Sequence, residues 1–145
     1  RQRQMCIRDR VKLPLPVSRS GKNFLWPARG RIISNFGPRL GGLHNDGINI
    51  AAPKGTPILA ADNGVVAYAG NGLKGFGNLI LIKHSGGWVT AYAHTEKIFV
   101  RRGTQVKRGQ KIATVGNTGG VKKPQLHFEV RKGSRAVDPR KELSS

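Results

Sequence analysis

Glycine-containing turns interrupt this sequence at short intervals, and brief apolar runs lie between them. Residues 65–69 end at Gly70-Asn-Gly72, and residues 78–84 end at Ser85-Gly-Gly87. Apolar and polar side chains alternate along residues 88–94, which is the period of a β-strand. Regular short strands with glycine turns are typical of a sandwich or barrel-like protein. We therefore predict an all-β fold with a compact core of antiparallel sheets.

Little helix is expected, with one helical turn at residues 95–98. The length of 145 residues and a hydrophobic content of 37% suit one domain with one small core. Residues 55–58 and 103–106 are similar, which indicates a faint internal duplication. The domain is predicted at residues 24–143. Residues 1–23 are interpreted as an arm and a proline-containing linker, in which residues 1–10 resemble translated sequencing-adapter sequence or form a disordered basic arm.

The charge of the chain is strongly positive, with 26 Lys and Arg against 7 Asp and Glu. Such a balance favours a polyanionic partner, which would be nucleic acid or an anionic wall or membrane surface. The basic residues are dispersed and no aromatic residues interleave with them, so a nucleic-acid partner is not expected. The single cysteine, Cys6, excludes a disulfide within the chain. No apolar stretch is long enough for a transmembrane segment, and no signal peptide is visible.

Four histidines are candidates for metal or proton chemistry, at positions 44, 84, 94 and 127. A zinc site needs three or four His, Asp, Glu or Cys ligands that converge on one point. His127 shares a strand face with Gln125, and His94 ends a strand on the face of Tyr92. His44 lies in a glycine-rich loop close to Asp46 and Asn49. His84 is interpreted as a solvated group at a strand end. Spacing alone leaves both a metal site and a chance grouping open.

Several segments together resemble the lysostaphin/LytM-type zinc metallopeptidase family. They are HNDGINIAAPKGTPI at residues 44–58, GFGNLILIKH at 75–84, AYAH at 91–94, VKRGQKIATVGNTG at 106–119 and LHFEVR at 126–131. The similarity covers nearly all of residues 24–143. It implies an all-β core of antiparallel sheets with a groove, one zinc ion, and cleavage of peptide cross-bridges in peptidoglycan.

The resemblance assigns roles to individual positions. His127 matches a zinc ligand, and His94 matches a catalytic histidine. His44 resembles the first zinc ligand, but it precedes Asn49 by five residues instead of the four that separate the family's His and Asp. Asn49 stands where the ligand Asp belongs. Gln125 stands where the family has a histidine that assists catalysis.

These two replacements put the zinc chemistry in doubt. Asn is a neutral and poorer oxygen ligand than Asp for a divalent cation. Gln125 cannot take up and return a proton near neutral pH, and losing a general base costs roughly 10²–10⁴-fold in rate. Asp46 remains a possible substitute ligand. Zinc is therefore expected as a cofactor only if the site is functional.

Family members with decayed sites are known as activators of cell-wall amidases in division, and the motif variant resembles those envelope proteins of Gram-negative bacteria. The resemblance implies a periplasmic or envelope location, with peptidoglycan, an N-acetylmuramoyl-L-alanine amidase and anionic envelope surfaces as partners. Gln125, Tyr92 and Asn45 are the residues predicted to line the partner-binding groove. The alternative is an active zinc endopeptidase that uses His44, His94 and His127.

Overall fold

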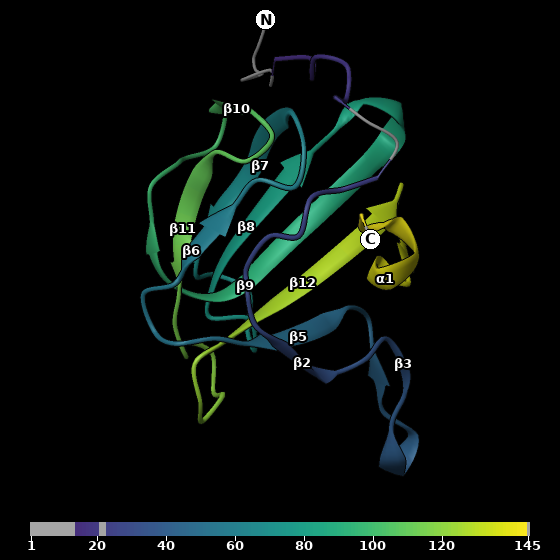
Figure 1. The fold of residues 1–145 in the computed structure, drawn as a ribbon, viewed down its shortest axis with the longest axis vertical. Coiled ribbons are helices and arrows are strands. Elements are labelled where there is room, and N and C mark those ends of the chain that lie inside the picture. The colour runs from purple at the N-terminus through teal and green to yellow at the C-terminus, as the bar shows by residue number, and fades with distance from the viewer. Residues whose placement is uncertain (1–13, 21–22, 145) are drawn as a thin grey trace, which may run out of the picture.

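The protein is described by a computed structural model in which residues 14–20 and 23–144 are placed. The prediction for residues 1–10 lies outside the described residues. The fold is almost entirely β, as predicted (Figure 1). Its strands are β2 (Arg31–Ser34), β3 (Gly37–Pro38), β4 (His44–Asn45), β5 (Ile48–Ala51), β6 (Pro57–Leu59), β7 (Gly64–Gly70), β8 (Asn78–Lys83), β9 (Trp88–Ile98), β10 (Gln105–Val106), β11 (Lys111–Val115), β12 (Gln125–Lys132) and β13 (Arg135–Val137). Three short helical segments are η1 (Leu40–Gly42), η2 (Ser85–Gly87) and α1 (Pro139–Glu142).

One large antiparallel sheet runs in the order β10-β7-β8-β9-β12-β5-β2, and β3 and β4 form a separate two-stranded sheet. The long strand β9 holds the large sheet together, because it pairs with β8, β12 and β11. The helical turn predicted at residues 95–98 was wrong. Thr95 and Ile98 instead pair with Val115 and Ala113 of β11, and this pairing makes residues 95–98 part of strand β9.

The core lies on one face of the central strands. In β12, Leu126, Phe128 and Val130 are fully buried, while Gln125 and His127 alternate with them on the other face. Strand β5, which pairs with β12 in the same sheet, repeats this pattern. Its residues Ile48 and Ile50 are fully buried, and Asn49 lies between them on the face of His127. The alternation of the two strands therefore directs one row of side chains to the core and one row to the candidate site.

The two similar segments noted in the sequence form equivalent turns. Gly55 and Gly103 both have a φ of 93°, a conformation that glycine adopts without a steric cost. Backbone N–H groups of Gly55 and Gly103 donate to Val115 and Val66, whose own N–H groups donate back to Thr56 and Thr104. The hydrogen-bond pattern of the two turns thus supports the predicted duplication.

His84 and Tyr92 lie in a buried polar chain, which corrects two predictions. His84 is 3% exposed and is not a solvated strand end, and Tyr92 is fully buried and does not line a groove. His84 Nδ1 donates to the Asn63 carbonyl at 2.7 Å, and its Nε2 faces Thr90 Oγ1 at 2.8 Å. Thr90 in turn contacts the Tyr92 hydroxyl at 2.7 Å, which accepts from the Ala61 N–H. The phenol is held in the core because this chain satisfies its hydroxyl.

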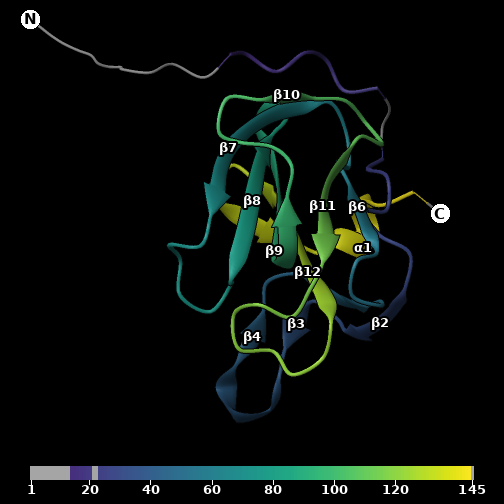
Figure 2. The same cartoon turned by 90° about the vertical axis from the view of Figure 1, so that its left-hand side faces the viewer.

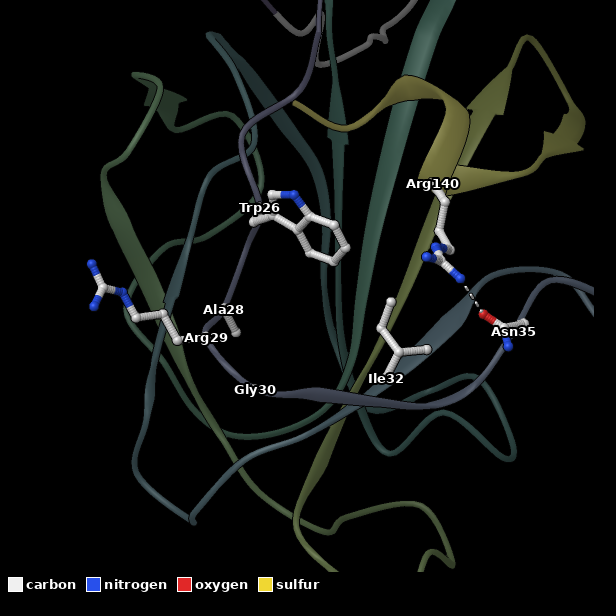
Figure 3. A pocket seen from close by; sticks show the side chains of 7 residues that line it. All are labelled: Trp26, Ala28, Arg29, Gly30, Ile32, Asn35 and Arg140. Atoms are coloured by element: carbon white, nitrogen blue, oxygen red, sulfur yellow. Dashed lines mark hydrogen bonds between the residues drawn. The ribbon is translucent and has the colours of Figure 1, made fainter. Parts of the chain in front are cut away.

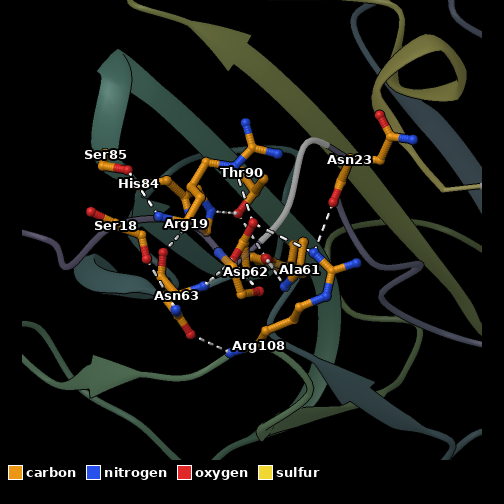
Figure 4. Close-up of polar contacts among 12 residues, drawn as sticks. Ser18, Arg19, Asn23, Ala61, Asp62, Asn63, His84, Ser85, Thr90 and Arg108 are labelled. Carbon is orange, nitrogen blue, oxygen red and sulfur yellow. Dashed lines mark hydrogen bonds and ion pairs between the residues drawn. The ribbon is translucent and has the colours of Figure 1, made fainter.

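Part of the predicted linker packs against the domain (Figure 4). Asp62 is fully buried, and its carboxylate accepts from Arg19 Nε at 3.0 Å and from the Ser20 N–H at 2.9 Å. The Arg19 guanidinium also lies 3.9 Å from the centre of the Phe24 ring, a cation–π geometry. Arg108 Nη1 reaches Asp62 from the other side at 3.5 Å. Packing therefore begins before the boundary that we predicted at residue 24.

Candidate functional site

Three of the predicted site residues meet where β5 and β12 pair. Asn49 lies opposite His127 in the register of these strands, and Gln125 lies opposite Ala51. Asn49 Nδ2 donates to Gln125 Oε1 at 2.8 Å, and Asn49 Oδ1 lies 3.2 Å from His127 Nδ1. The amide oxygen of Asn49 therefore faces a ring nitrogen of His127, and its amide nitrogen donates a hydrogen bond to Gln125.

Asn45 supports this arrangement from β4. Its Nδ2 donates to Asn49 Oδ1 at 3.1 Å and to Ser34 Oγ at 2.9 Å, and its Oδ1 accepts from the Gly47 N–H at 3.1 Å. The three carboxamides of Asn45, Asn49 and Gln125 are called the amide network below. Ser34 was not predicted from the sequence. A bulge in β2 between Ile32 and Ser34 brings it opposite Asn49, and a bulge of this kind leaves no clear signal in the sequence.

A second chain of contacts runs from His127 to the loop that carries His44. His127 Nε2 lies 2.8 Å from Glu129 Oε2, and Arg131 binds Glu129 Oε1 through Nε and Nη2, both at 2.8 Å. Arg131 Nη2 also lies 3.7 Å from Asp46, whose carboxylate is 3.0 Å from His44 Nδ1. Glu129 and Arg131 were not predicted, although their two-residue spacing from His127 places them on its face of β12.

His94 lies beside His127, with 6.1 Å between the ring centres. Its backbone φ is 65°, which is rare for a residue other than glycine and costs roughly 1–3 kcal/mol. His94 Nδ1 donates to the Thr118 carbonyl at 2.7 Å. Burial lowers the pKa of His94, the Thr118 hydrogen bond raises it, and nearby His127 lowers it, for a net decrease. His94 is therefore neutral near pH 7, with Nε2 unbonded within the described chain.

The predicted zinc ligands do not form a metal-binding set as they lie. Within residues 14–20 and 23–144, no group of three or more His, Cys, Asp or Glu side chains could hold a metal ion. Asn49 Oδ1 lies within hydrogen-bond distance of both Asn45 and His127, so its lone pairs are engaged. Asp46, the predicted substitute ligand, is half exposed and contacts His44 and Arg131. The oxygen donor at position 49 is thus a neutral carboxamide, which binds a divalent cation more weakly than a carboxylate does.

Exposed leucines flank this site. Leu40 is 96% exposed and Leu43 is 69% exposed, and both lie in the connection from β3 to β4. Figure 2 shows the β3–β4 unit projecting at the same end of the molecule as the connection between β11 and β12. His44 follows Leu43 directly, and its ring meets the Phe36 ring edge-on at 5.2 Å. A protrusion with two exposed leucines therefore directly precedes Asn45 of the amide network in the chain.

The chain is similar in sequence to bacterial envelope and division proteins. It is 54% identical over 123 residues to "Cell division protein DipM" of Caulobacter vibrioides, a match that covers 84% of this chain and 20% of that protein. It is 49% identical over 114 residues to "Murein hydrolase activator NlpD" of Escherichia coli, which covers 79% of this chain and 29% of NlpD. The chain thus spans about a fifth to a third of the length of these relatives.

Solved structures of peptidases share its fold. A zinc-containing peptidase from Vibrio cholerae superposes with a TM-score of 0.77 at 35% identity, over 84% of this chain and 41% of that chain. The catalytic domain of lysostaphin from Staphylococcus simulans superposes with a TM-score of 0.73 at 34% identity, over 80% of this chain and 93% of that chain. The sequence pattern of "Peptidase family M23" matches residues 43–139, which include every predicted site residue. The chain therefore belongs to peptidase family M23, as its resemblance to the lysostaphin/LytM type implied.

Proposed function

We propose that this domain is a non-catalytic member of the M23 family that activates a peptidoglycan amidase of the N-acetylmuramoyl-L-alanine class. The observation that carries the proposal is the hydrogen bond between Asn49 and Gln125. These carboxamides stand at the positions of a ligand carboxylate and a catalytic histidine in the family pattern. The names of DipM and NlpD, a division protein and a murein hydrolase activator, support the same assignment.

The physical argument against hydrolysis concerns both the metal and the proton. A divalent ion at this position would have to displace the contacts of Asn49 with Asn45 and Gln125 and would gain no compensating anionic charge. Gln125 cannot carry a proton to a leaving amine. His94 retains a basic Nε2, but one histidine without a metal or an oxyanion site is a weak catalyst of amide hydrolysis. The site is therefore better suited to binding than to bond cleavage.

The docking surface that we assign to the amidase combines the amide network with the leucine protrusion of Leu40 and Leu43. An apolar protrusion beside a dense set of hydrogen-bonding groups suits an amphipathic segment of a partner, which buries its apolar side chains on the leucines. Burial of an exposed leucine on binding contributes roughly 1.5–3 kcal/mol. Residues with this exposure have little influence on the stability of the free domain.

The test measures amidase activity on purified peptidoglycan with and without this domain. The unmodified domain should stimulate the amidase and release no product by itself. Leu40→Glu and Leu43→Glu should each reduce stimulation about 10-fold or more. Leu15→Glu is the matched control, because Leu15 is 89% exposed in a different part of the chain. Cross-link cleavage by the domain alone, with one tightly bound zinc per chain, would refute the proposal.

The alternative function is an active zinc endopeptidase, which is favoured by the presence of His44, His94 and His127. Its test is a digest of cross-linked muropeptides with protein reloaded with zinc. The double variant Asn49→Asp with Gln125→His restores the family's residue types at both positions and serves as the positive comparison. Zinc-dependent cleavage by the unmodified protein, at a rate close to that of an active double variant, would favour the alternative.

The basic composition fits a location in the cell envelope. Several relatives are named lipoproteins, among them "Lipoprotein NlpD/LppB homolog" of Pseudomonas aeruginosa. We propose a periplasmic or envelope location in which the net charge of +19 favours contact with peptidoglycan carboxylates and anionic lipid surfaces. No helix in the described ranges has the length and apolarity of a membrane span.

A further inference from the structure

A hollow of about 590 Å³ is lined mainly by residues near the start of the domain, none of which belongs to the amide network (Figure 3). Its lining includes Trp26, Arg29, Ile32, Asn35 and Arg140. These residues come from the segment that precedes β2, from β2 and its end, and from α1. The volume falls in the range of small-molecule sites in proteins.

The hollow and the amide network lie on opposite faces of the paired strands β2 and β5. Ile32 pairs with Ile50, which points into the core, whereas Ser34 pairs with Asn49 of the amide network. The bulge between Ile32 and Ser34 reverses the side-chain alternation, so the two residues face different sides. A ligand in the hollow would therefore not compete directly with a partner on the amide network.

Trp26 forms a fixed aromatic wall of the hollow. Its Nε1 donates to the Ser144 carbonyl at 2.7 Å, and its ring packs against the core, which holds the indole in one orientation. In Figure 3 the indole and the Arg140 side chain stand on either side of the hollow, with Ile32 below them. The negative face of an aromatic ring attracts the C–H groups of an apolar ring face, such as that of a pyranose.

Arg140 gives the hollow a positive charge at its rim, whereas the Arg29 side chain extends away from Arg140 in Figure 3. Arg140 Nη1 donates to Asn35 Oδ1 at 3.2 Å, which holds the guanidinium at the rim and leaves its other N–H groups available. Arg29 is exposed, and its side chain has no hydrogen bond or ion pair within the described chain. The nearby Asp138 carboxylate is engaged, because it caps α1 by accepting from the Arg140 N–H at 3.0 Å. A guanidinium group recognises a carboxylate through two parallel hydrogen bonds.

We propose that this hollow binds a saccharide that carries a carboxylate, with the sugar ring on Trp26 and the carboxylate on Arg140. The choice of a wall saccharide rests on the proposed function, which brings the domain to peptidoglycan. The site would hold the domain on glycan strands from which the amidase has already removed the stem peptides, because only there is the lactyl carboxylate free, while the opposite face of β2 and β5 engages the amidase.

The experiment titrates the full chain with N-acetylmuramic acid and follows the two indole N–H signals by NMR. Trp26 is the reporter, and Trp88, the only other tryptophan, is the internal reference. N-acetylglucosamine is the matched probe, because it lacks only the lactyl group that carries the carboxylate, and lactate is the probe without the ring. We expect a Trp26 shift with a millimolar dissociation constant for N-acetylmuramic acid and about 10-fold weaker binding of both other probes.

Arg140→Gln should weaken the binding of N-acetylmuramic acid about 10-fold, and Arg29→Gln should change it little. Arg102→Gln is the control, because it removes the same charge from an exposed position outside the hollow. Equal binding by the Arg140→Gln variant, equal binding of lactate or adenosine monophosphate, or no Trp26 shift up to about 20 mM ligand would overturn the inference. Amidase stimulation is measured separately, so failure of the saccharide site is distinguishable from failure of the proposed function.

Discussion

Asn49 and Gln125 are 76 residues apart in the sequence, and their side chains are joined by a hydrogen bond of 2.8 Å across the pairing of β5 and β12. The family resemblance predicts that these positions correspond to an acid that binds zinc and a histidine that assists catalysis. Here the Asn49 amide nitrogen donates to the Gln125 amide oxygen, and the Asn45 amide nitrogen donates to the Asn49 amide oxygen. The site is thus stabilised by neutral hydrogen bonds that need no metal.

The first prediction concerns the energy of this contact. Asn49→Ala should destabilise the domain by about 1–3 kcal/mol, because it leaves partly buried groups of Gln125 and Asn45 without a partner. In a double-mutant cycle by urea unfolding, Asn49→Ala and Gln125→Ala should show a coupling of roughly 0.5–1.5 kcal/mol. Combination with Arg102→Ala, at an exposed position, should be additive. Additive losses for the Asn49–Gln125 pair would contradict the arrangement described here.

The second prediction concerns metal content. Protein that is stripped with a chelator and reloaded with zinc should retain much less than one zinc ion per chain after dialysis, and its melting temperature should not change. The double variant Asn49→Asp with Gln125→His should hold zinc more tightly than the unmodified protein, because it supplies a charged ligand. Mass spectrometry of the native protein and elemental analysis provide the measurements. An increase in the melting temperature of the unmodified chain with added zinc would argue for a functional centre.

The third prediction concerns acid stability and depends on His84. Burial lowers the pKa of His84 from 6.5 to about 4, so the folded state binds this proton less readily than the unfolded chain. Stability is therefore fully present above pH 6.5 and falls as the pH decreases toward 4, by a total of about 3 kcal/mol. Protonation would place a second N–H opposite Thr90 Oγ1 and disturb the hydrogen-bond chain to Tyr92.

Urea unfolding at several pH values measures this slope, and His84→Gln should be less stable at pH 7 but lose less stability between pH 6.5 and 4. Asp62 affects the pH dependence of stability only at lower pH. Burial acts to raise the pKa of Asp62, but hydrogen bonds from Ser20, Asn63 and Arg19 lower it below its usual value, so its contribution is lost as the pH falls through that value. A pH profile that is the same for His84→Gln and the unmodified chain would refute the assignment.

The fourth prediction concerns the segment before the expected domain boundary. A chain that begins at Phe24 should be less stable than the full chain, because Asp62 would lose its contacts with Arg19 and Ser20 while remaining buried. Arg19→Ala should reproduce much of this loss, by roughly 3 kcal/mol or less. Lys12→Ala, at a position outside the described residues, is the comparison for loss of one positive charge. Equal melting temperatures for the full and shortened chains would contradict the prediction.

The fifth prediction concerns salt. Binding of the domain to isolated peptidoglycan should weaken as the salt concentration increases from 0.05 to 0.5 M, because exposed charges are screened over about 8–10 Å at ordinary ionic strength. A sedimentation assay with a neutral reference protein measures the bound fraction. Amidase stimulation through Leu40 and Leu43 should depend less on salt, since it arises from apolar burial. Salt-insensitive wall binding would exclude the basic surface as its cause.

Local patterns in the sequence were sufficient for the fold class. The two-residue alternation in residues 125–130 places Leu126 and Phe128 in the core and Gln125 and His127 outside it, as the structure has them. The prediction that Asn49 and Gln125 depart from the zinc pattern came instead from the resemblance to the family and stays a prediction. These features are readable because strand periodicity and motif spacing depend on neighbouring residues only.

The tertiary structure decided which distant groups meet. The segment 95–98, predicted as a helical turn, is a strand because β11 pairs with it. His84 and Tyr92 are buried, and the hydrogen bonds through Thr90 satisfy their polar atoms there. Strand register placed Asn49 against Gln125, and the arrangement of β12 and the His44 loop placed Arg131 near Asp46. Burial and long-range pairing depend on how the whole chain packs, and the spacing of residues in the sequence does not predict that packing.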